Sequence, residues 1–382
     1  MQFILDNITQ VGWRECVMYA VGIILIYLAI SKEYEPALLL PIGFGAILIN
    51  LPFIGLFDQP HSYGPIAWLY ENGINAAEIM PLLLFIGIGA MIDFGPILSR
   101  PFYFFYGAAA QLGIFAAITI SVIFGFDLRD AVAIGIIGAA DGPVTILVAR
   151  MMDTQFMGPI LVTAFSYMAL VPIIQPAVIN LLTTRRERKI RIAPVPEKEI
   201  PKSVRIIFPI AVTFVVAFIS PPAVYLIGFL MFGNLIRECT VLDSLSETAQ
   251  KTLTNIITLL LGLTIAFTLQ AKDFIRIETL MILGLGLIAF IVNTASGVLF
   301  AKFLNIFLKN KINPMIGAAG ISAFPMSARV VQKMALKDDP SNILLMHAVS
   351  ANVSGQIASV AASGIVLSFI VRHLAILAAL TG

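Results

Sequence analysis

The run Gly138-Ala139-Ala140-Asp141-Gly142-Pro143 places a carboxylate beside helix-breaking residues, inside a stretch otherwise apolar enough to cross a bilayer. Charging a carboxylate at mid-membrane costs about 2.5–3.5 kcal/mol on insertion scales, so such groups usually pair, bind a cation or titrate. A Gly-Pro pair interrupts the helix, and the carbonyls that lose their helical donors can turn toward the same cation. The run therefore predicts a broken helix with an ion site at Asp141.

The composition of the chain indicates a polytopic membrane protein. Of its 382 residues, 59% are hydrophobic and only 12% are charged, and the mean hydropathy is +0.95, far from the balance of a soluble domain. Apolar runs of about 17–25 residues follow one another with short polar joints, so we expect an all-α protein with about eleven membrane-spanning segments. Their expected ranges are 16–31, 37–57, 79–93, 100–124, 128–150, 156–182, 204–239, 253–270, 279–306, 313–335 and 341–371.

Several function classes do not fit this sequence. The formal net charge of +2 is too small for a nucleic-acid-binding protein. No P-loop pattern is present, so ATP is not the energy source within this chain. Cys16 and Cys239 lie far apart, without the spacing of a metal or redox site, and are expected to be free thiols.

The basic connector at residues 183–202 sets the expected orientation. Its first half carries Arg185, Arg186, Arg188, Lys189 and Arg191. Positive charge favours the cytoplasmic side of a membrane, so we expect this connector in the cytoplasm. Counting spans in both directions then predicts a cytoplasmic N-terminus and an external C-terminus.

An internal repeat relates the two halves of the chain. Residues 137–152 read IGAADGPVTILVARMM and residues 316–334 read IGAAGISAFPMSARVVQKM, and both reach Ala-Arg after a proline. We expect two transmembrane repeats of five spans each, in which the fourth span is broken. The predicted parts are an N-terminal span (1–35), a first repeat (36–182), a basic cytoplasmic linker (183–203) and a second repeat (204–372).

The range 204–239 decides how the repeats are related. Pro221-Pro222 in its middle fits either a kink in one long span or a hairpin between two helices. With a single crossing, the repeats enter the membrane from opposite sides, which is the inverted-repeat plan of many secondary transporters. In that plan the two broken helices meet near the midplane and share a site.

Polar residues near the two breaks are the candidate ligands of that site. Besides Asp141, they are Asn313, Ser322, Ser327, Asn352 and Ser354. Carboxylate, amide and hydroxyl oxygens are hard ligands that suit Na+, and a carboxylate can hold a proton instead. The pattern therefore predicts a site for Na+ or a proton.

Simpler roles are open for several of these residues. Asp141 would also cap the broken helix or pair with Arg329, and Asn313 before a proline is a common helix start. Serines also permit close helix packing, and Arg150 and Arg329 fit interfacial anchors as well as ligand binders. His347 is a lone imidazole that is more often packed than catalytic. Helix-to-helix hydrogen bonds are the expected use of Gln111, Asn293 and Gln356.

Two stretches resemble a known family. GIIGAADGPVTILVA in the first half, and KINPMIGAAGISAFPMSARVVQKMALKDDPSNILLMHAVSANVSGQIASVAASG in the second, are similar to the membrane-integral beta subunit of the Na+-translocating carboxylic-acid decarboxylases. This family includes the oxaloacetate, methylmalonyl-CoA and glutaconyl-CoA enzymes. The resemblance extends over nearly all the chain and is sharpest at 131–152 and 311–364. Ala139 stands where many relatives would have glycine, which leaves the Asp-Gly-Pro run intact.

The resemblance implies a function for the whole chain. Members of the family take carboxybiotin from a swinging biotin domain, decarboxylate it at the membrane, and couple CO2 release to Na+ export and uptake of an external proton. Na+ and carboxybiotin carried on a partner subunit are the implied cofactors. The implied setting is a prokaryotic inner membrane. The implied partners are a carboxyltransferase subunit, a biotin carrier subunit and a small membrane subunit, and small-residue helix faces also suit a homo-oligomer.

The resemblance also implies residue roles. Asp141 looks like the aspartate that handles Na+ and the proton, and Asn313, Gly317 and Ser322 match other functional positions. Asn313 and Ser322 would help to coordinate Na+, with Ser322 also relaying the proton, and Arg329 would hold carboxybiotin or balance the charge of the site. A stand-alone Na+-coupled or Na+/H+ secondary transporter would show the same repeats and buried acid, and it is the alternative.

Overall fold

The computed structural model describes residues 11–33, 35–51, 65–75, 79–192 and 200–381. Within these ranges the chain is helical and has no strand, as the composition predicts. Six described helices are long and apolar enough to cross a membrane, or seven if a bent pair counts as one span. They are Trp13–Lys32, Pro101–Ile123, Met157–Leu182, Asp243–Leu269, Ile277–Phe307 and Leu345–Ile370. The protein is therefore multi-pass, while the expected count of eleven spans is not confirmed.

The first two described helices form an antiparallel pair. They are α2 (Trp13–Lys32) and α3 (Pro36–Ile49), and the Tyr19 hydroxyl donates to the Asn50 carbonyl at 2.7 Å. The pair crosses at two glycines, because a Cβ added at Gly22 would lie 2.7 Å from the Gly43 carbonyl oxygen. Small residues at such crossings let two membrane helices approach closely.

The range 204–239 is also an antiparallel pair rather than one crossing. It contains α13 (Lys202–Ile219), a 3-10 turn η5 (Pro221–Ala223) and α14 (Val224–Glu238), and α13 packs against α14. The Arg205 guanidinium at the start of α13 lies 3.6 Å from Glu238 at the end of α14. The two prolines thus mark a turn between two helices, which answers the question that the sequence left open.

Six helices form one side of the molecule. Their packing order is α2, α3, α16 (Thr254–Ala266), α5 (Ile79–Met91), α14 and α13. A Cβ added at Gly45 of α3 would lie 2.5 Å from the Ala266 Cβ, so α3 and α16 touch with little between them. Because each helix in this order packs on the next, we describe these six helices as one layer, the panel.

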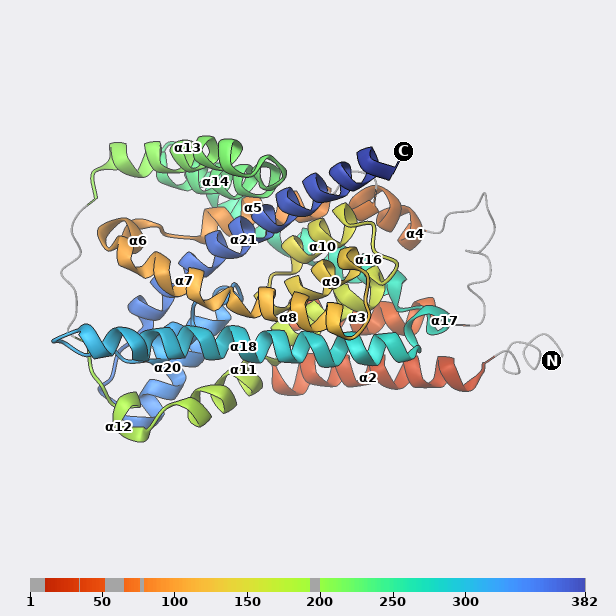
Figure 1. Ribbon diagram of the computed structural model, residues 1–382, viewed down its shortest axis with the longest axis horizontal. Coiled ribbons are helices and arrows are strands. Elements are labelled where there is room, and N and C mark those ends of the chain that lie inside the picture. Colours follow the sequence, from red (N-terminus) through yellow and green to blue (C-terminus); the bar gives the residue numbers. More distant parts are fainter. Residues whose placement is uncertain (1–10, 34, 52–64, 76–78, 193–199, 382) are drawn as a thin grey trace.

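The longest helices lie outside the panel. They are α11 (Met157–Leu182), α18 (Ile277–Phe307) and α21 (Leu345–Thr381), together with the successive α7 (Phe104–Ala110) and α8 (Leu112–Ile123). α11 packs on α18, and α21 packs on α7, as the neighbouring long ribbons in Figure 1 indicate. These helices surround the two broken segments.

Each broken segment folds back on itself. The first hairpin contains α9 (Leu128–Gly135), η4 (Ile136–Ala139) and α10 (Gly142–Met151). Its two ends lie together, because the Thr154 hydroxyl donates to Asp130 Oδ1 at 2.5 Å. A broken helix that crossed the membrane would hold its ends far apart, since 24 residues of helix extend about 36 Å. The expectation of a broken crossing at 128–150 is therefore replaced by a hairpin.

The second hairpin contains α19 (Met315–Ala318) and α20 (Met326–Asp338). Asn313 before it and Asn342 after it both donate to the carbonyls of Arg188 and Ile190, at distances between 2.7 and 3.3 Å. Two residues that share the same acceptors lie side by side. The expected crossing at 313–335 is thus also a hairpin.

The two hairpins enter from opposite ends of the molecule. The linker end carries α12 (Arg185–Arg188), and Lys302 near the end of α18 donates there to the Leu182 carbonyl at 3.0 Å. The opposite end carries α17 (Ala271–Phe274), which contacts α2. In Figure 1, α12 and α20 lie on the left and α17 on the right. The remaining short elements are α4 (Pro65–Tyr70), η2 (Glu71–Asn75), α6 (Gly95–Ser99), η3 (Pro101–Tyr103), α15 (Asp243–Thr248), η6 (Ala249–Leu253) and η7 (Phe267–Leu269).

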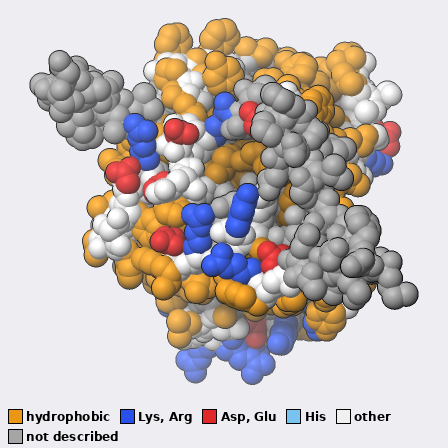
Figure 2. All heavy atoms as spheres, turned by 90° about the vertical axis from the view of Figure 1, so that its right-hand side faces the viewer, with side chains coloured by type: hydrophobic (Ala, Val, Ile, Leu, Met, Phe, Trp, Pro, Cys, Tyr) orange, Lys and Arg blue, Asp and Glu red, His pale blue; other side chains and the backbone are white. Residues whose placement is uncertain are grey.

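The surface agrees with a membrane setting. Large apolar side chains are exposed on the outer helices, including Trp13, Leu181 and Phe218. Figure 2 views the molecule from the end opposite the linker, where charged side chains lie over the middle of the face with apolar side chains above and below them. An apolar circumference around charged ends is the arrangement that a bilayer favours.

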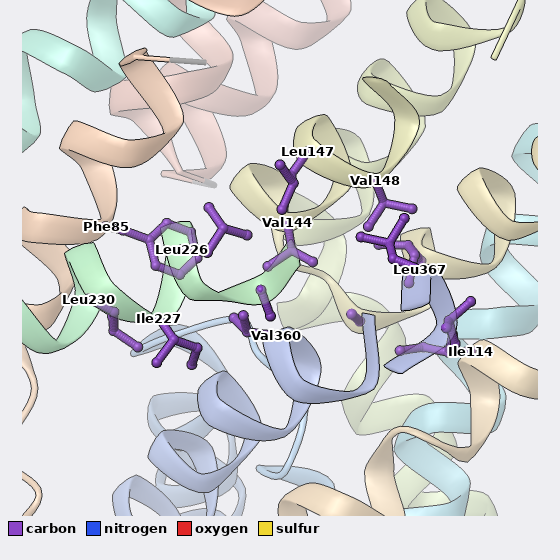
Figure 3. Close-up of a cluster of buried hydrophobic side chains, with 14 of the residues drawn as sticks. Phe85, Ile114, Val144, Leu147, Val148, Leu226, Ile227, Leu230, Val360 and Leu367 are labelled. Atoms are coloured by element: carbon purple, nitrogen blue, oxygen red, sulfur yellow. The ribbon is translucent and has the colours of Figure 1, made fainter. Parts of the chain in front are cut away.

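The apolar core fixes the position of the first hairpin. Val144, Leu147 and Val148 of α10 belong to one buried cluster with residues of α5, α14 and α21. Figure 3 shows Val144 next to Val360 of α21, with Phe85 of α5 further to the left. Burying one such side chain contributes about 1.5–3 kcal/mol. The start of α10, which carries Asp141, is therefore held by apolar contacts to three other helices.

Candidate ion site at the meeting of the two hairpins

The tips of the two hairpins meet in the interior. The Ser322 amide of the second hairpin donates to the Ala139 carbonyl of the first at 3.1 Å. Ala140 adopts the left-handed conformation, with a φ of 53°, which turns the chain sharply before α10 begins. The break at Asp141 and the break at Ser322 thus form one centre, as the sequence predicts.

Asp141 lies at that centre with 3% of its surface exposed. Its Oδ1 accepts from the Val144 amide at 3.3 Å, so the side chain caps α10. Its Oδ2 accepts from the Ser359 hydroxyl of α21 at 2.9 Å. Among the described residues, no cationic side chain lies beside this carboxylate, and a pair with Arg329 is not present. Asp141 is therefore a capping residue whose second oxygen faces another helix.

Ser359 is a site residue that the sequence analysis missed. It is fully buried, and it belongs to a series of serines on α21 that includes Ser350, Ser354 and Ser363. Their spacings of four, five and four residues put Ser350 and Ser354 on one face of the helix and Ser359 and Ser363 on the opposite face, so the spacing does not single out Ser359. Only the fold shows which of these hydroxyls reaches Asp141.

In the described part of the chain, four buried Asn and Gln side chains next to the breaks have only their amide nitrogens hydrogen-bonded. Each donates its amide hydrogens to backbone carbonyls that the breaks leave free: Asn293 to Gly138, Gln111 to Gly320, Asn352 to Ile321 and Gln356 to Ser322. The side-chain oxygen of each of these four residues is buried and has no partner among the described residues. An unsatisfied buried acceptor costs about 1–3 kcal/mol. Carboxamide oxygens are hard ligands of the kind that a cation such as Na+ accepts.

Ser322 links the second break to α21. Its hydroxyl donates to the Gly355 carbonyl at 2.9 Å, and its carbonyl accepts from Gln356. Gly320 and Gly355 are in backbone contact there, because a Cβ added at Gly355 would overlap the Gly320 carbonyl. The structure therefore brings Ser322 and Asn352 to the Asp141 centre.

Gly317 and Ser354 hold neighbouring helices. A Cβ added at Gly317 would overlap the Gly297 carbonyl of α18, so this glycine permits a close helix crossing. The Ser354 hydroxyl accepts from the Gly107 amide at 3.0 Å and donates to the Ala351 carbonyl at 2.6 Å. Ser327 accepts from the Gln175 amide at 2.6 Å. These three residues lie around the break, each in a packing or hydrogen-bonding role.

Asn313 lies at the base of the second hairpin rather than at its tip. Its amide hydrogens are used on the linker carbonyls of Arg188 and Ile190, and its Oδ1 accepts from the Met315 amide at 3.1 Å. The side chain both caps α19 and attaches the linker. Its described hydrogen bonds do not include Asp141.

The two arginines and the histidine lie apart from the carboxylate. The Arg329 side chain is exposed on α20 and lies close enough to Glu35 of the α2–α3 turn for their charges to interact. His347 is buried, and its Nδ1 lies 2.5 Å from the Tyr103 hydroxyl. Arg150 near the end of α10 is 8 residues beyond the Asp-Gly pair by sequence position. His347 is thus packed and hydrogen-bonded, as expected.

Comparison with known proteins places this chain in a family. Residues 14–370 match the model of the Na+-transporting oxaloacetate decarboxylase beta subunit. The chain is 45% identical to the methylmalonyl-CoA decarboxylase subunit beta of Propionigenium modestum, covering 96% of this chain and 99% of that protein.

Two further relatives agree. The glutaconyl-CoA decarboxylase subunit beta of Acidaminococcus fermentans is 45% identical, with 94% of each chain covered. The oxaloacetate decarboxylase beta chain of Klebsiella pneumoniae is 41% identical, covering 95% of this chain and 97% of that protein. The expected resemblance is thereby confirmed over nearly the full length, and the chain belongs to the family of Na+-transporting decarboxylase beta subunits.

Proposed function

We propose that this chain is the membrane subunit of a biotin-dependent decarboxylase sodium pump. It decarboxylates carboxybiotin delivered by a partner subunit, and it couples that reaction to Na+ export and proton uptake. Family membership supports the class of activity. The observation that carries the assignment is the buried Asp141 carboxylate at the meeting of two hairpin tips, whose backbone carbonyls are held by four carboxamide side chains with unpaired oxygens.

The coupling follows from the chemistry of one carboxylate. Asp141 holds Na+ or a proton but is poorly placed to hold both, so loading one releases the other. Ser322 and Asn352 lie with Asp141 at the tips and complete the Na+ site with the unpaired oxygens. Ser354 and Gly317 support these positions through α7 and α18.

Asn313 and Arg329 belong to a second part of the proposal. For Asn313 to serve as a Na+ ligand, its bonds to the linker would have to open, because both amide hydrogens are engaged there. In this proposal the exposed Arg329 guanidinium, which lies within electrostatic reach of Glu35, attracts the negatively charged carboxybiotin as it approaches or balances the charge of the site. Ser322, whose hydroxyl now donates to Gly355, would relay the proton after rotating toward Asp141.

We further propose that the chain is built from two inverted repeats. Matched packing supports this: α2 on α3 corresponds to α13 on α14, α5 on α14 to α16 on α3, and α11 on α18 to α21 on α7. Each repeat then has five crossing helices and one hairpin that does not cross. This arrangement gives α2 a counterpart in α13 and replaces the expected eleven spans.

The linker end faces the cytoplasm in this proposal, because it carries the basic residues of the linker. α21 runs from there to the other end, so the C-terminus is external, as expected. α2 begins beside α17 at the end opposite the linker, which makes the N-terminal side external rather than cytoplasmic. The membrane is the inner membrane of a prokaryotic cell.

The proposed partners follow from the reaction. A carboxyltransferase subunit loads biotin, a biotin carrier subunit brings it to the linker end, and a small membrane subunit joins the complex. The relatives are named as subunits, which supports a multi-subunit assembly. Small-residue helix faces also suit a homo-oligomer.

The test is CO2 release from free carboxybiotin by the purified chain, with and without Na+. Na+-stimulated release is expected. A stand-alone secondary transporter would instead release no CO2 under any salt, although it would still bind Na+ at Asp141. Co-purification with a biotinylated protein is the second readout, because a transporter of that kind works alone.

A further inference from the structure

A large cavity lies at the linker end, away from the hairpin tips. Its volume is about 940 Å³. Arg100 and the aromatic rings of Tyr103 and Tyr106 line one wall, and the opposite wall comes from the linker around Arg191 and from the segment that holds Lys309 and Lys311. The cavity therefore lies between the start of α7, the linker and the approach to the second hairpin.

The cationic side chains of this cavity differ in how far they are already neutralised. Arg191 donates twice to Asp339, at 2.7 and 2.9 Å, and these bonds hold the pKa of Asp339 below its usual range. Lys311 donates to the Asn305 carbonyl. In the part of the chain that the structure describes, Arg100 and Lys309 have no acidic partner. Arg100 lies against the Tyr103 side chain instead. Two unneutralised cations thus face the same cavity.

The aromatic wall is rigid. The rings of Tyr103 and Tyr106 lie 5.8 Å apart between centroids, and the Tyr103 hydroxyl is hydrogen-bonded to His347 of α21. Both tyrosines are at least nine-tenths buried. Tyr103 therefore supplies the accessible part of the aromatic wall, and Tyr106 supports it from the interior. An aromatic ring beside fixed cations suits a planar ligand that carries one negative charge.

The helix that carries the aromatic wall, α7, also packs against the second break. A Cβ added at Gly320 in the second break would lie 2.5 Å from the Tyr106 carbonyl oxygen. The next residue, Gly107, donates its amide to Ser354 of α21. A ligand that binds in the cavity therefore contacts α7, and α7 packs against the second break.

We propose that this cavity binds the carboxylated ureido ring of the carrier, with Arg100 and Lys309 facing its carboxylate and Tyr103, which packs on Tyr106, beside the ring. This inference rests on the proposed function. It adds the location of the reacting group, which the comparisons do not assign. The ligand class is a planar cyclic urea that bears an N-carboxylate.

The experiment measures decarboxylation of free carboxybiotin by the purified full-length chain with saturating Na+. The variants are Arg100→Gln and Lys309→Gln. The matched control is Arg186→Gln, because Arg186 is an exposed cation of α12 at the same end and does not line the cavity. Removing one of two cations that meet a carboxylate should raise KM about tenfold, which is about 1.4 kcal/mol. The control should change KM less than twofold.

A second readout separates binding from folding. The Na+ concentration that half-saturates a 22Na+ binding assay should stay unchanged in both variants, because neither side chain lies at the hairpin tips. If KM is unchanged in both variants, or if Arg186→Gln raises it equally, the cavity is not the binding site. If the unmodified chain releases no CO2 at all, the proposed function fails, and that outcome is distinct from a failure of the cavity assignment.

Discussion

Replacing Ser359 by alanine tests the geometry of the Asp141 centre most sharply. The Ser359 hydroxyl donates to Asp141 Oδ2 at 2.9 Å in a site shielded from water. A hydrogen bond to a charged group contributes about 1.5–3 kcal/mol. Without it, the carboxylate loses one of its two described donors and is free to turn from the ion-binding orientation. Taking the low end of that range, the affinity for Na+ should fall about tenfold.

The assay is the Na+ dependence of CO2 release from free carboxybiotin, with Ser363→Ala as the matched control. Ser363 lies one turn further along α21, is equally buried, and donates only to the Ser359 carbonyl at 2.6 Å. The Ser359 variant should need about ten times more Na+ for half-maximal rate, while the control should need less than twice as much. Equal shifts in both variants would refute the reasoning, because the effect would then come from helix packing.

Three further predictions concern the hairpins and the linker. Gly320→Ala places a Cβ 2.5 Å from a carbonyl oxygen of α7 and should cost about 1–3 kcal/mol in thermal unfolding, whereas Gly284→Ala, which meets nothing within 4 Å, should be neutral. Asn313→Ala removes both side-chain bonds to the linker, so tryptic cleavage at residues 185–191 should accelerate about tenfold; an unchanged rate would mean that these bonds do not hold the linker. Arg191 lowers the pKa of Asp339. The ion pair that attaches the linker to Asp339 is therefore fully formed above the ordinary carboxyl pKa of 3.8, and it is lost as the pH falls through the lowered pKa of Asp339. Hydrogen exchange of the linker should then accelerate in acid, and Asp339→Asn should abolish that pH dependence.

The helix break and the cap at Asp141 could be predicted from sequence because the residues that form them are adjacent in the chain. The run Asp141-Gly142-Pro143 predicts both the start of a helix and its cap, and in the structure Asp141 caps α10. The internal repeat correctly indicated that a second break, at Ser322, lies beside the first. Family membership was likewise readable from two contiguous stretches.

The hairpins, the role of Ser359 and the linker contacts of Asn313 could not be predicted from sequence, because they depend on how the chain folds back on itself. A broken crossing and a hairpin have the same apolar pattern, and only the contact between Asp130 and Thr154 distinguishes them. Ser359 is one of several serines four or five residues apart on α21, and its partner lies 218 residues away in the chain. The carbonyls that accept from Asn313 lie 123 and 125 residues away in the chain, so its hydrogen bonds to the linker could not be predicted from sequence either.

The most direct test of the central claim is Na+ transport by Asp141→Asn in proteoliposomes that contain the assembled complex. Asp127→Asn is the control, because Asp127 caps α9 as Asp141 caps α10, but at the base of the hairpin. We predict that Asp141→Asn abolishes decarboxylation-driven 22Na+ uptake and the Na+ stimulation of CO2 release, while the control keeps both. Na+-dependent decarboxylation and transport that survive in Asp141→Asn would contradict the account.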